Sequence, residues 1–465
     1  MNRTAVINVV GLSESLLGAH TPRLNAFRQG GALCRITPAF PAVTCTAQSN
    51  YLTGVPPAKH GIVGNGWYNR ELAEVHFWKQ SNHLVGAKKL WDVLREQDPN
   101  FTCAQLFWWF NMYSTADWTI TPRPMYPADG RKVFDIYAWP YSVRDQIKRD
   151  LGEFPFPGFW GPAAGVDTPQ GSADSVSRWI AESAKWIERK FHPTLNLIYL
   201  PHLDYNLQRL GPTHPEISND LRRVDEIVGD LIQFFEKQSV QVVILSEYGI
   251  SAVDSPIHLN RLFREKGWLA IKEELDRELL DCGASRVFAV ADHQVAHVYL
   301  NDPSLENAAR ALMEKQPGIG EVWGENEKRA NGLDHRRAGD FIAVSKENAW
   351  FTYYYWLDDR RAPDFACTVD IHRKPGYDPV ELFLDPAIPL IKPRIAWRLL
   401  QKRLGFRILM DVIPLDASLV RGSHGRRPAR TDEWPILISG NSRAVTERNL
   451  DSSEIFEFLR RHLLE

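Results

Sequence analysis

The chain has 465 residues, of which 44% are hydrophobic, and it carries a formal net charge of −2 at pH 7. A chain of this size can bury a large core, and its length alone is typical of two or three domains. The nearly balanced charge and a pI of about 6.7 give no electrostatic basis for binding a nucleic-acid polymer.

Cysteine usage and apolar runs indicate the class of protein. The cysteines occur singly, with no C-x-x-C pair, which argues against a disulfide framework and against a thiolate zinc site. The chain has no run of about 18 apolar residues, so we expect no transmembrane helix. We therefore expect a soluble, cytoplasmic protein, and the alternative is a chain that has lost a leader segment.

The first predicted element is a buried strand at Ala5–Val10. Two later segments, Leu195–Leu200 and Gln241–Leu245, are continuous apolar runs, which is typical of central parallel strands buried on both faces. Between them, Asn219–Gln238 has apolar residues at helical spacing and charges on the other face. This alternation predicts an α/β fold, a mostly parallel sheet with helices on both faces.

Polar residues follow two of these predicted strands. His202 and Asp204 come directly after the run at 195–200, and Ser246–Gly249 follows the run at 241–245. Ligands of open α/β sheets lie beyond the carboxyl ends of the strands. We therefore expect the functional site at this edge of the sheet.

Two regions fit the sheet poorly because they are dense in aromatic residues. Residues 104–170 also hold many prolines, and residues 345–420 hold an aromatic cluster and a basic helix-like stretch, Lys392–Arg407. We predict one α/β domain over residues 1–465, with 104–170 and 345–420 as cap insertions over the site. The alternative is that their aromatic residues form hydrophobic core.

Thr44 lies at a predicted helix start, in the segment Phe40–Gly66. A hydroxyl there lies among unpaired backbone N–H groups at the positive end of the helix dipole, which suits an anionic phosphate. An ordinary N-cap threonine is the alternative.

The order of residues around Thr44 resembles the type I phosphodiesterase/nucleotide pyrophosphatase family of the alkaline phosphatase superfamily. The family patterns are F-P-x-x-T and T-G-x-x-P-x-x-H-G-I-x-G-N, and the second is matched by Thr53, Gly54, Pro57, His60, Gly61, Ile62, Gly64 and Asn65. The resemblance, over residues 5–70, 195–300 and 420–440, implies an alkaline-phosphatase-like fold. It also implies a hydrolase of phosphoric ester or anhydride bonds with Thr44 as the nucleophile.

The resemblance also implies residues that bind the substrate. The family often has an asparagine three residues after the threonine, where this chain has Ala47, and Gln48 is the nearest amide. Loss of one such donor costs about 10²–10³ in rate. We expect Gln48 and Asn65 to contact the substrate.

One family metal is held by Y-x-x-x-P-D-x-x-G-H-x-x-G-P and by a distant H-G. Tyr199–Pro212 is similar: Asp204 matches the family aspartate, Gln208 replaces the family histidine, and His424 matches the distant histidine. The second metal uses an aspartate, the threonine and S-D-H-G. Here Val10 replaces the first aspartate, and Glu247 and Tyr248 replace the aspartate and histidine of the turn.

Other acidic and histidine residues are candidates for the missing ligands. A structural histidine or surface pair is the ordinary alternative for each of Asp292, His293, His297, His202, His258, Asp334–His335 and Asp370–His372. We predict Asp204, Glu247, His293 and His424 as metal ligands, with His202 next. One or two divalent ions are implied; zinc suits histidine and carboxylate ligands, and a carboxylate-rich set also accepts manganese or magnesium.

The resulting hypothesis is a metal-dependent phosphohydrolase. It would cleave a phosphodiester, nucleotide pyrophosphate or phosphonate through Thr44, so its partner would be a small phosphorylated substrate. A phosphoryl or headgroup transferase, in which an alcohol replaces water, remains an alternative. A further alternative is a catalytically degenerate relative that binds a phosphorylated ligand or a partner, which Val10, Gln208 and Tyr248 favour. The sequence gives no indication of oligomeric state.

Overall fold

A nine-stranded sheet organises the larger part of the computed structural model, which describes residues 1–165, 171–442, 445 and 447–464. The strand order is β21-β2-β20-β9-β1-β8-β5-β6-β7. The bounds are β1 Thr4–Val9, β2 Ala32–Thr37, β5 Cys103–Leu106, β6 Trp118–Pro122, β7 Ile136–Trp139, β8 Leu195–Leu200, β9 Gln241–Leu245, β20 Ile436–Ser439 and β21 Asn449–Asp451.

The centre of this sheet confirms the predicted strands. Strand β1 pairs in parallel with β8 on one side and with β9 on the other, with Thr4 opposite both Leu195 and Gln241. Strands β1 and β8 are buried along their whole length, as expected of continuous apolar runs with helices on both faces. The predicted α/β class is therefore confirmed.

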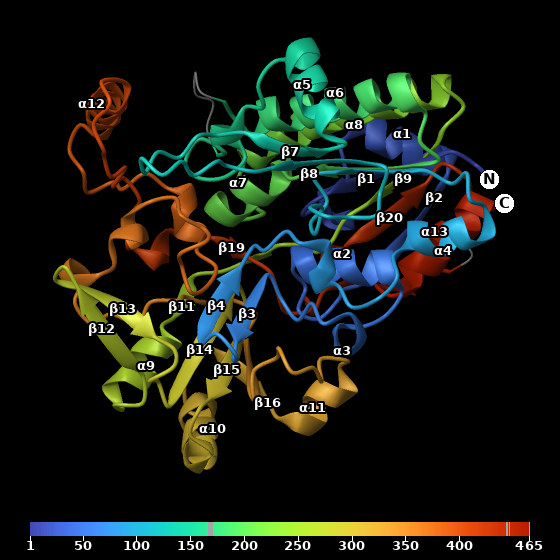
Figure 1. Cartoon of the computed structure of the whole chain (residues 1–465). Coiled ribbons are helices and arrows are strands. Elements are labelled where there is room, and N and C mark those ends of the chain that lie inside the picture. The colour runs from blue at the N-terminus through green and yellow to red at the C-terminus, as the bar shows by residue number, and fades with distance from the viewer. Residues whose placement is uncertain (166–170, 443–444, 446, 465) are drawn as a thin grey trace.

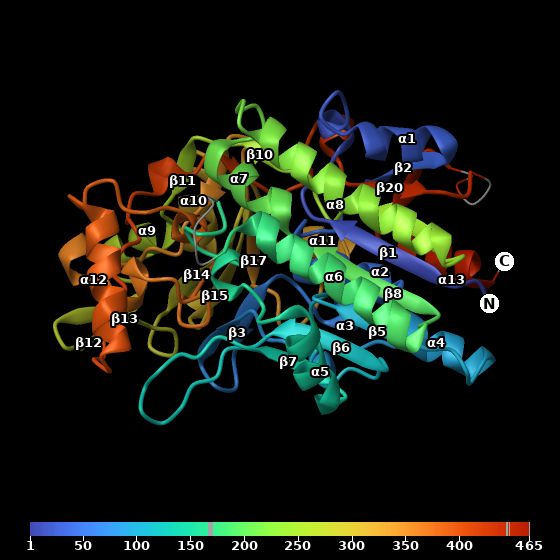
Figure 2. The same ribbon diagram turned by 90° about the horizontal axis from the view of Figure 1, so that it is seen from above.

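Helices cover both faces of the sheet. The bounds are α1 Pro22–Gly30, α2 Thr44–Thr53, α3 Pro57–His60, α4 Leu90–Gln97, α5 Tyr141–Leu151, α6 Ala173–Phe191, α7 His202–Leu210, α8 Ile217–Lys237 and α13 Glu454–Leu464. Figure 1 shows α1, α6 and α8 on one face and α2, α4 and α13 on the other. Figure 2 shows α6 and α8 lying across β1 and β8. The helix expected at 219–238 is α8.

A second lobe is built on a four-stranded antiparallel sheet, β14-β15-β17-β16. Its hydrophobic core is separate from the core of the large sheet. The elements of this part are β3 Gly66–Asn69, β4 Glu74–Phe77, β10 Ser251–Ala252, β11 Ser255–Ile257, α9 Leu259–Glu265, β12 Ala270–Glu274, β13 Arg277–Asp281, β14 Val287–Asp292, β15 Val295–Leu300, α10 Glu306–Glu314, β16 Ile319–Trp323, α11 Glu325–Ala330, β17 Phe341–Ser345, β18 Ala349–Phe351, α12 Ile391–Arg403 and β19 Gly422–Ser423.

The two aromatic-rich regions are integrated into these layers. Strands β6 and β7, within residues 104–170, form one edge of the large sheet, so this segment is not wholly outside it. Residues 166–170 lie outside the described part of the chain. In the second region, the side chains from Trp350 to Trp356 are buried and belong to the core of the second lobe. That cluster has the structural role expected of most buried aromatic residues.

Two further expectations concern cysteines and membrane spans. All five cysteines are free, so no disulfide joins the described residues. Within the same residues, none of the helices combines the length and the apolar character needed to cross a membrane.

Candidate active site

Thr44 is the first residue of α2, so the predicted helix start is confirmed. Its N-cap, Val43, has extended backbone, and the helix ends at Gly54, whose φ of 69° is left-handed. All residues of α2 are buried, and Thr44 itself is 3% exposed. The sequence thus holds the Thr44 hydroxyl at the positive end of a buried helix.

The Thr44 hydroxyl contacts a tyrosine in place of a metal ligand. Its Oγ1 lies 3.2 Å from the Tyr248 hydroxyl, and that hydroxyl donates a 3.2 Å hydrogen bond to Asp204 Oδ1. Tyr248 follows β9, and Asp204 lies in the first turn of α7 after β8. Burial raises the pKa of Asp204 to about 7, although hydrogen bonds from Gln208 and Tyr248 lower it.

Glu247 lies beside the same hydroxyl and is fully buried. Asn8 Nδ2 and Gln48 Nε2 each donate a 2.5 Å hydrogen bond to its Oε1, while its Oε2 has no hydrogen-bond partner. Gln48 Oε1 in turn accepts from the Trp109 backbone N–H at 2.6 Å. Burial raises the pKa of Glu247 to about 8, against the lowering effect of its hydrogen bonds with Gln48 and Asn8.

Four aromatic rings form a column next to these carboxyls. The Tyr248 ring stacks on His424 at 3.6 Å, His424 lies 3.7 Å from His293, and His293 stacks on Tyr377 at 3.5 Å, all between centroids. His424 Nδ1 donates to the Ala42 carbonyl at 2.7 Å, which leaves Nε2 without a proton, 3.9 Å from Asp204. Burial lowers the pKa of both histidines well below the usual value.

Asn65 joins the start of α2 to the second lobe. Its backbone N–H and its Nδ2 donate to Asp292 at 2.7 and 3.1 Å, and its Oδ1 accepts from the Cys45 N–H at 3.1 Å. Asp292 also contacts His293 Nδ1 at 2.8 Å, and burial raises its pKa to about 6. All the side-chain groups of Asn65 are therefore engaged in holding the site together.

A model of the type I phosphodiesterase / nucleotide pyrophosphatase family matches residues 4–378. The chain belongs to this family. The family is one of phosphodiesterases and nucleotide pyrophosphatases, which is the class of hydrolase that the sequence predicts. The resemblance drawn from the Thr44 segment is likewise confirmed.

Solved structures of similar fold can be aligned with nearly the whole of this chain. Phosphonoacetate hydrolase from Sinorhizobium meliloti 1021, in complex with phosphonoformate, has a TM-score of 0.62 and 16% identity and covers 100% of this chain and 96% of its own. Murine ectonucleotide pyrophosphatase / phosphodiesterase 5, in an inactive form with AMP, has a TM-score of 0.59 and 14% identity and covers 100% and 95%. These likenesses confirm the alkaline-phosphatase-like fold.

One curated relative also matches this phosphodiesterase-family chain. An uncharacterized pyrophosphatase/phosphodiesterase of Schizosaccharomyces pombe is 22% identical over 234 residues, which are 49% of this chain and 39% of that protein. The match thus spans about two fifths of the relative's length.

The structure brings together some of the predicted site residues and not others. Thr44, Gln48, Asp204, Glu247, His293 and His424 are joined through the contacts described above. His202 instead pairs with Asp220 of α8 at 3.4 Å. Both ring nitrogens of His297 contact backbone, the Val63 carbonyl and the Gly339 N–H.

Two site residues were missed by the sequence analysis. Asn8 was counted within an apolar strand, although a lone amide inside that run is a signal of a buried polar partner. Tyr377 closes the ring column and donates to Gln208 Oε1 at 2.9 Å. It comes from residues 371–378, far from the other site segments, so no local pattern indicates its place.

The donors present do not fit the metal site that the resemblance implies. Among the described residues, no group of three His, Cys, Asp or Glu side chains is placed to hold a metal ion. Zinc needs its ligand atoms about 2 Å from one point, whereas the Tyr248 hydroxyl lies between Thr44 and Asp204. Gln208, at the family histidine position, is engaged by Tyr377. A tyrosine hydroxyl and stacked rings thus take the place of the ligand set.

Proposed function

We propose that this chain is a phosphohydrolase that uses Thr44 to cleave a small phosphodiester, nucleotide pyrophosphate or phosphonate. The observation that carries the proposal is the hydrogen-bonded series from the Thr44 hydroxyl through Tyr248 to Asp204. The substrate class is supported by the family and by fold neighbours solved with AMP and with a phosphonate. The N-terminus of α2 suits an anion, and Glu247 Oε2, which has no hydrogen-bond partner, is able to donate to one when the carboxyl is protonated.

The direction of the hydrogen bonds favours Thr44 as the nucleophile. When Asp204 is ionised, Tyr248 donates its only proton to that carboxylate, so the Thr44 hydroxyl donates to Tyr248. As Thr44 Oγ1 bonds to phosphorus, the bond from phosphorus to the leaving group breaks and that group takes up a proton from solvent, while the threonine proton passes to Tyr248 and the tyrosine proton to Asp204. Water then attacks the phosphorylated Thr44 and gives up one proton to solvent, and the proton held by Asp204 returns through Tyr248 to Thr44 as its bond to phosphorus breaks.

The buried carboxyls must be compatible with a negatively charged substrate. Among the described residues, Asp204, Glu247 and Asp292 form no ion pair with lysine or arginine, and the histidines beside Asp204 and Asp292 are neutral because burial lowers their pKa. With a pKa of about 8, Glu247 is mainly protonated at neutral pH and is able to donate to a phosphoryl oxygen. A neutral Glu247 thus removes repulsion that an ionised one would exert.

The predicted divalent metal, whether zinc, manganese or magnesium, has no place in these steps because the donor set does not fit it. We therefore expect turnover to persist in protein stripped of metal by chelation. A cytoplasmic location and a small phosphorylated substrate remain predictions of the sequence.

A second candidate function is binding of a phosphorylated ligand without turnover. It is favoured by Val10, Gln208 and Tyr248 at family ligand positions and by the lack of a three-ligand metal group in the described chain. A binder and an enzyme would both take up the ligand, so turnover must be measured together with binding.

The test is hydrolysis of a chromogenic phosphodiester and phosphonate panel by chelated protein, with and without added Zn²⁺, Mn²⁺ or Mg²⁺. Thr44→Ala should abolish turnover, and Thr53→Ala, at the other end of α2, should leave it unchanged. Turnover only with added metal would contradict the metal-free relay. No turnover under any condition, together with calorimetric binding of AMP, would establish the binder instead.

A further inference from the structure

Helix α12 is unlike the other long helices of the described chain because none of its residues is buried. Figures 1 and 2 both place it at the periphery of the molecule, attached through extended segments. Its contacts with the body are few: Ile391 and Ile395 pack against the core of the second lobe, and Arg394 and Arg398 pair with Asp411. The rest of its surface faces outward.

The outward surface is both apolar and basic. Trp397, Leu400 and Leu404 follow one another at helical spacing and are 57%, 46% and 65% exposed. From residue 390 to 409 the chain carries six basic side chains and no acidic one, although the whole protein has a net charge of −2. The exposed large hydrophobic side chains of this segment are Leu390, Trp397, Leu399, Leu400, Leu404, Phe406 and Leu409.

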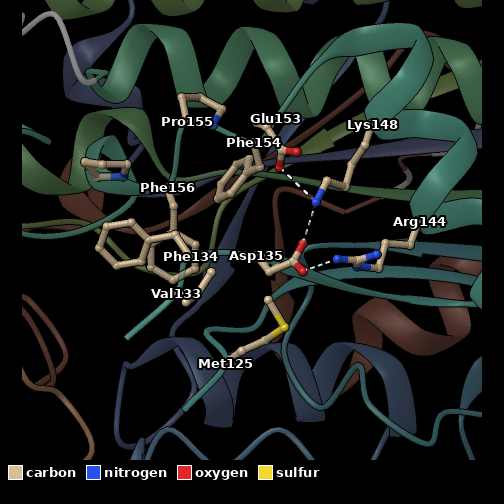
Figure 3. A pocket seen from close by; sticks show the side chains of 11 residues that line it. Met125, Val133, Phe134, Asp135, Arg144, Lys148, Glu153, Phe154, Pro155 and Phe156 are labelled. Carbon is tan, nitrogen blue, oxygen red and sulfur yellow. Dashed lines mark hydrogen bonds and ion pairs between the residues drawn. The ribbon is translucent and has the colours of Figure 1, made fainter. Parts of the chain in front are cut away.

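A neighbouring loop extends this surface. Lys402 Nζ lies 5.7 Å from the centre of the Phe134 ring, which is itself 42% exposed. Phe134 and Met125 line a surface hollow of about 590 Å³, which is also lined by Asp135 and its ion-pair partners Arg144 and Lys148 (Figure 3). The apolar rim of that hollow therefore continues the face of α12.

We propose that α12 and the segment to Leu409 dock on an anionic lipid surface, so that the protein is peripheral to a membrane. A basic helix with exposed Trp and Leu side chains matches the chemistry of such an interface, where the apolar side chains enter the acyl boundary and the basic ones contact headgroups. This inference is independent of the proposed hydrolysis.

Charge complementarity favours a lipid surface over other occupants. A nucleic acid would pair with the basic side chains that do not pair with Asp411 but would leave the Trp397, Leu400 and Leu404 stripe in water. A second copy of the chain would bring two strongly positive faces together, which is unfavourable. An anionic bilayer satisfies the basic and the apolar side chains at once.

The experiment is co-sedimentation of the full chain with vesicles of phosphatidylcholine plus phosphatidylglycerol, and with vesicles of phosphatidylcholine alone. Binding is expected only to the anionic vesicles and should weaken at high salt. The combined variant Lys392→Glu, Lys402→Glu and Arg403→Glu should reduce partitioning roughly 100-fold, since each basic side chain near the surface contributes about fivefold. Trp397→Ser with Leu400→Ser should reduce it about 10-fold.

The matched control variant reverses the charge of three exposed lysines outside α12, by Lys237→Glu, Lys266→Glu and Lys315→Glu. It should bind anionic vesicles as the original protein does. Thermal unfolding checks that every variant is folded. Equal binding by all variants, or no binding to anionic vesicles, would overturn the proposal. Self-association that Trp397→Ser with Leu400→Ser abolishes, without vesicle binding, would overturn it as well and identify an interface between copies.

Discussion

The Tyr248 hydroxyl lies 3.2 Å from both Thr44 and Asp204 and is the group that joins them. Removing it as Tyr248→Phe keeps the ring that stacks on His424 but interrupts the proton route. We expect turnover to fall about 10²–10³-fold, the usual effect of losing general-base assistance, with thermal stability little changed. Steady-state kinetics measure this. Tyr205→Phe, which removes another buried hydroxyl that bonds the Phe159 carbonyl, is the control. Equal rates for Tyr248→Phe and the original protein would exclude the route.

The two raised pKa values predict a pH profile. The proton route requires Asp204 to be ionised, so kcat/KM should rise as pH increases through about 7. Donation to the phosphoryl group requires Glu247 to be protonated, so kcat/KM should fall as pH increases through about 8. Because the two carboxyls interact, the two apparent pKa values of the profile belong to the pair and not to either residue alone. Asp204→Asn should remove the rise on the acid side. A profile that is flat from about pH 6 to 9 would contradict these roles.

Individual site residues differed in how far the sequence could predict them. Thr44 and Asp204 are found where chain order and strand ends indicate, because a parallel sheet gathers its carboxyl ends at one edge. His424 follows β19, outside that sheet, and was indicated only by the resemblance to the family. The ring column could not be predicted in this way. It depends on Tyr248 stacking on His424 and Tyr377 stacking on His293, from segments more than a hundred residues apart, which no local periodicity encodes.

At the scale of elements, the hairpin of β12 and β13 is tied to α9 by one buried ion pair. Arg264 Nη2 donates to Glu278 Oε1 at 2.9 Å, and Nη1 bonds the other oxygen. The hydrogen bond from Arg264 lowers the pKa of Glu278. The ion pair therefore stabilises the folded protein above the ordinary pKa of a glutamate, and this stabilisation is lost as pH falls through the lowered value.

Glu278→Gln should therefore destabilise the protein by about 2 kcal/mol at neutral pH, and the difference should shrink toward zero in acid. Urea unfolding at several pH values measures both. Glu274→Gln, which affects an exposed pair with Lys272 on the same hairpin, should change stability by less than about 0.5 kcal/mol. A penalty for Glu278→Gln that stays constant down to acid pH would show that the ionised pair is not its source.

At the same scale, strands of the large sheet were easier to predict than those of the second lobe. β8 and β9 coincide with the apolar runs seen in the sequence, because strands buried on both faces need apolar residues throughout. β12 and β16 are half exposed and carry glutamates, so their sequences do not distinguish a strand from a loop. Most of the second lobe was therefore not foreseen.

At the scale of the whole molecule, the site lies where the two cores meet. Thr44 belongs to a helix of the large sheet, while His293 and Asp292 lie at the turn between β14 and β15 of the second lobe. Asn65 connects the two through its bonds to Cys45 and Asp292. The relative position of the lobes therefore sets the geometry around the Thr44 hydroxyl, and only the folded chain as a whole contains the site.

The central claim is that Thr44 becomes covalently bonded to phosphorus during turnover. The direct measurement is an acid quench of the working enzyme with a phosphodiester substrate, followed by peptide mass spectrometry. We predict on the peptide that contains Thr44 the added mass of the phosphoryl group with its remaining ester substituent, located at Thr44 itself and absent from Thr44→Ala. Turnover without a modified peptide at any quench time would contradict the account, and so would undiminished turnover by Thr44→Ala.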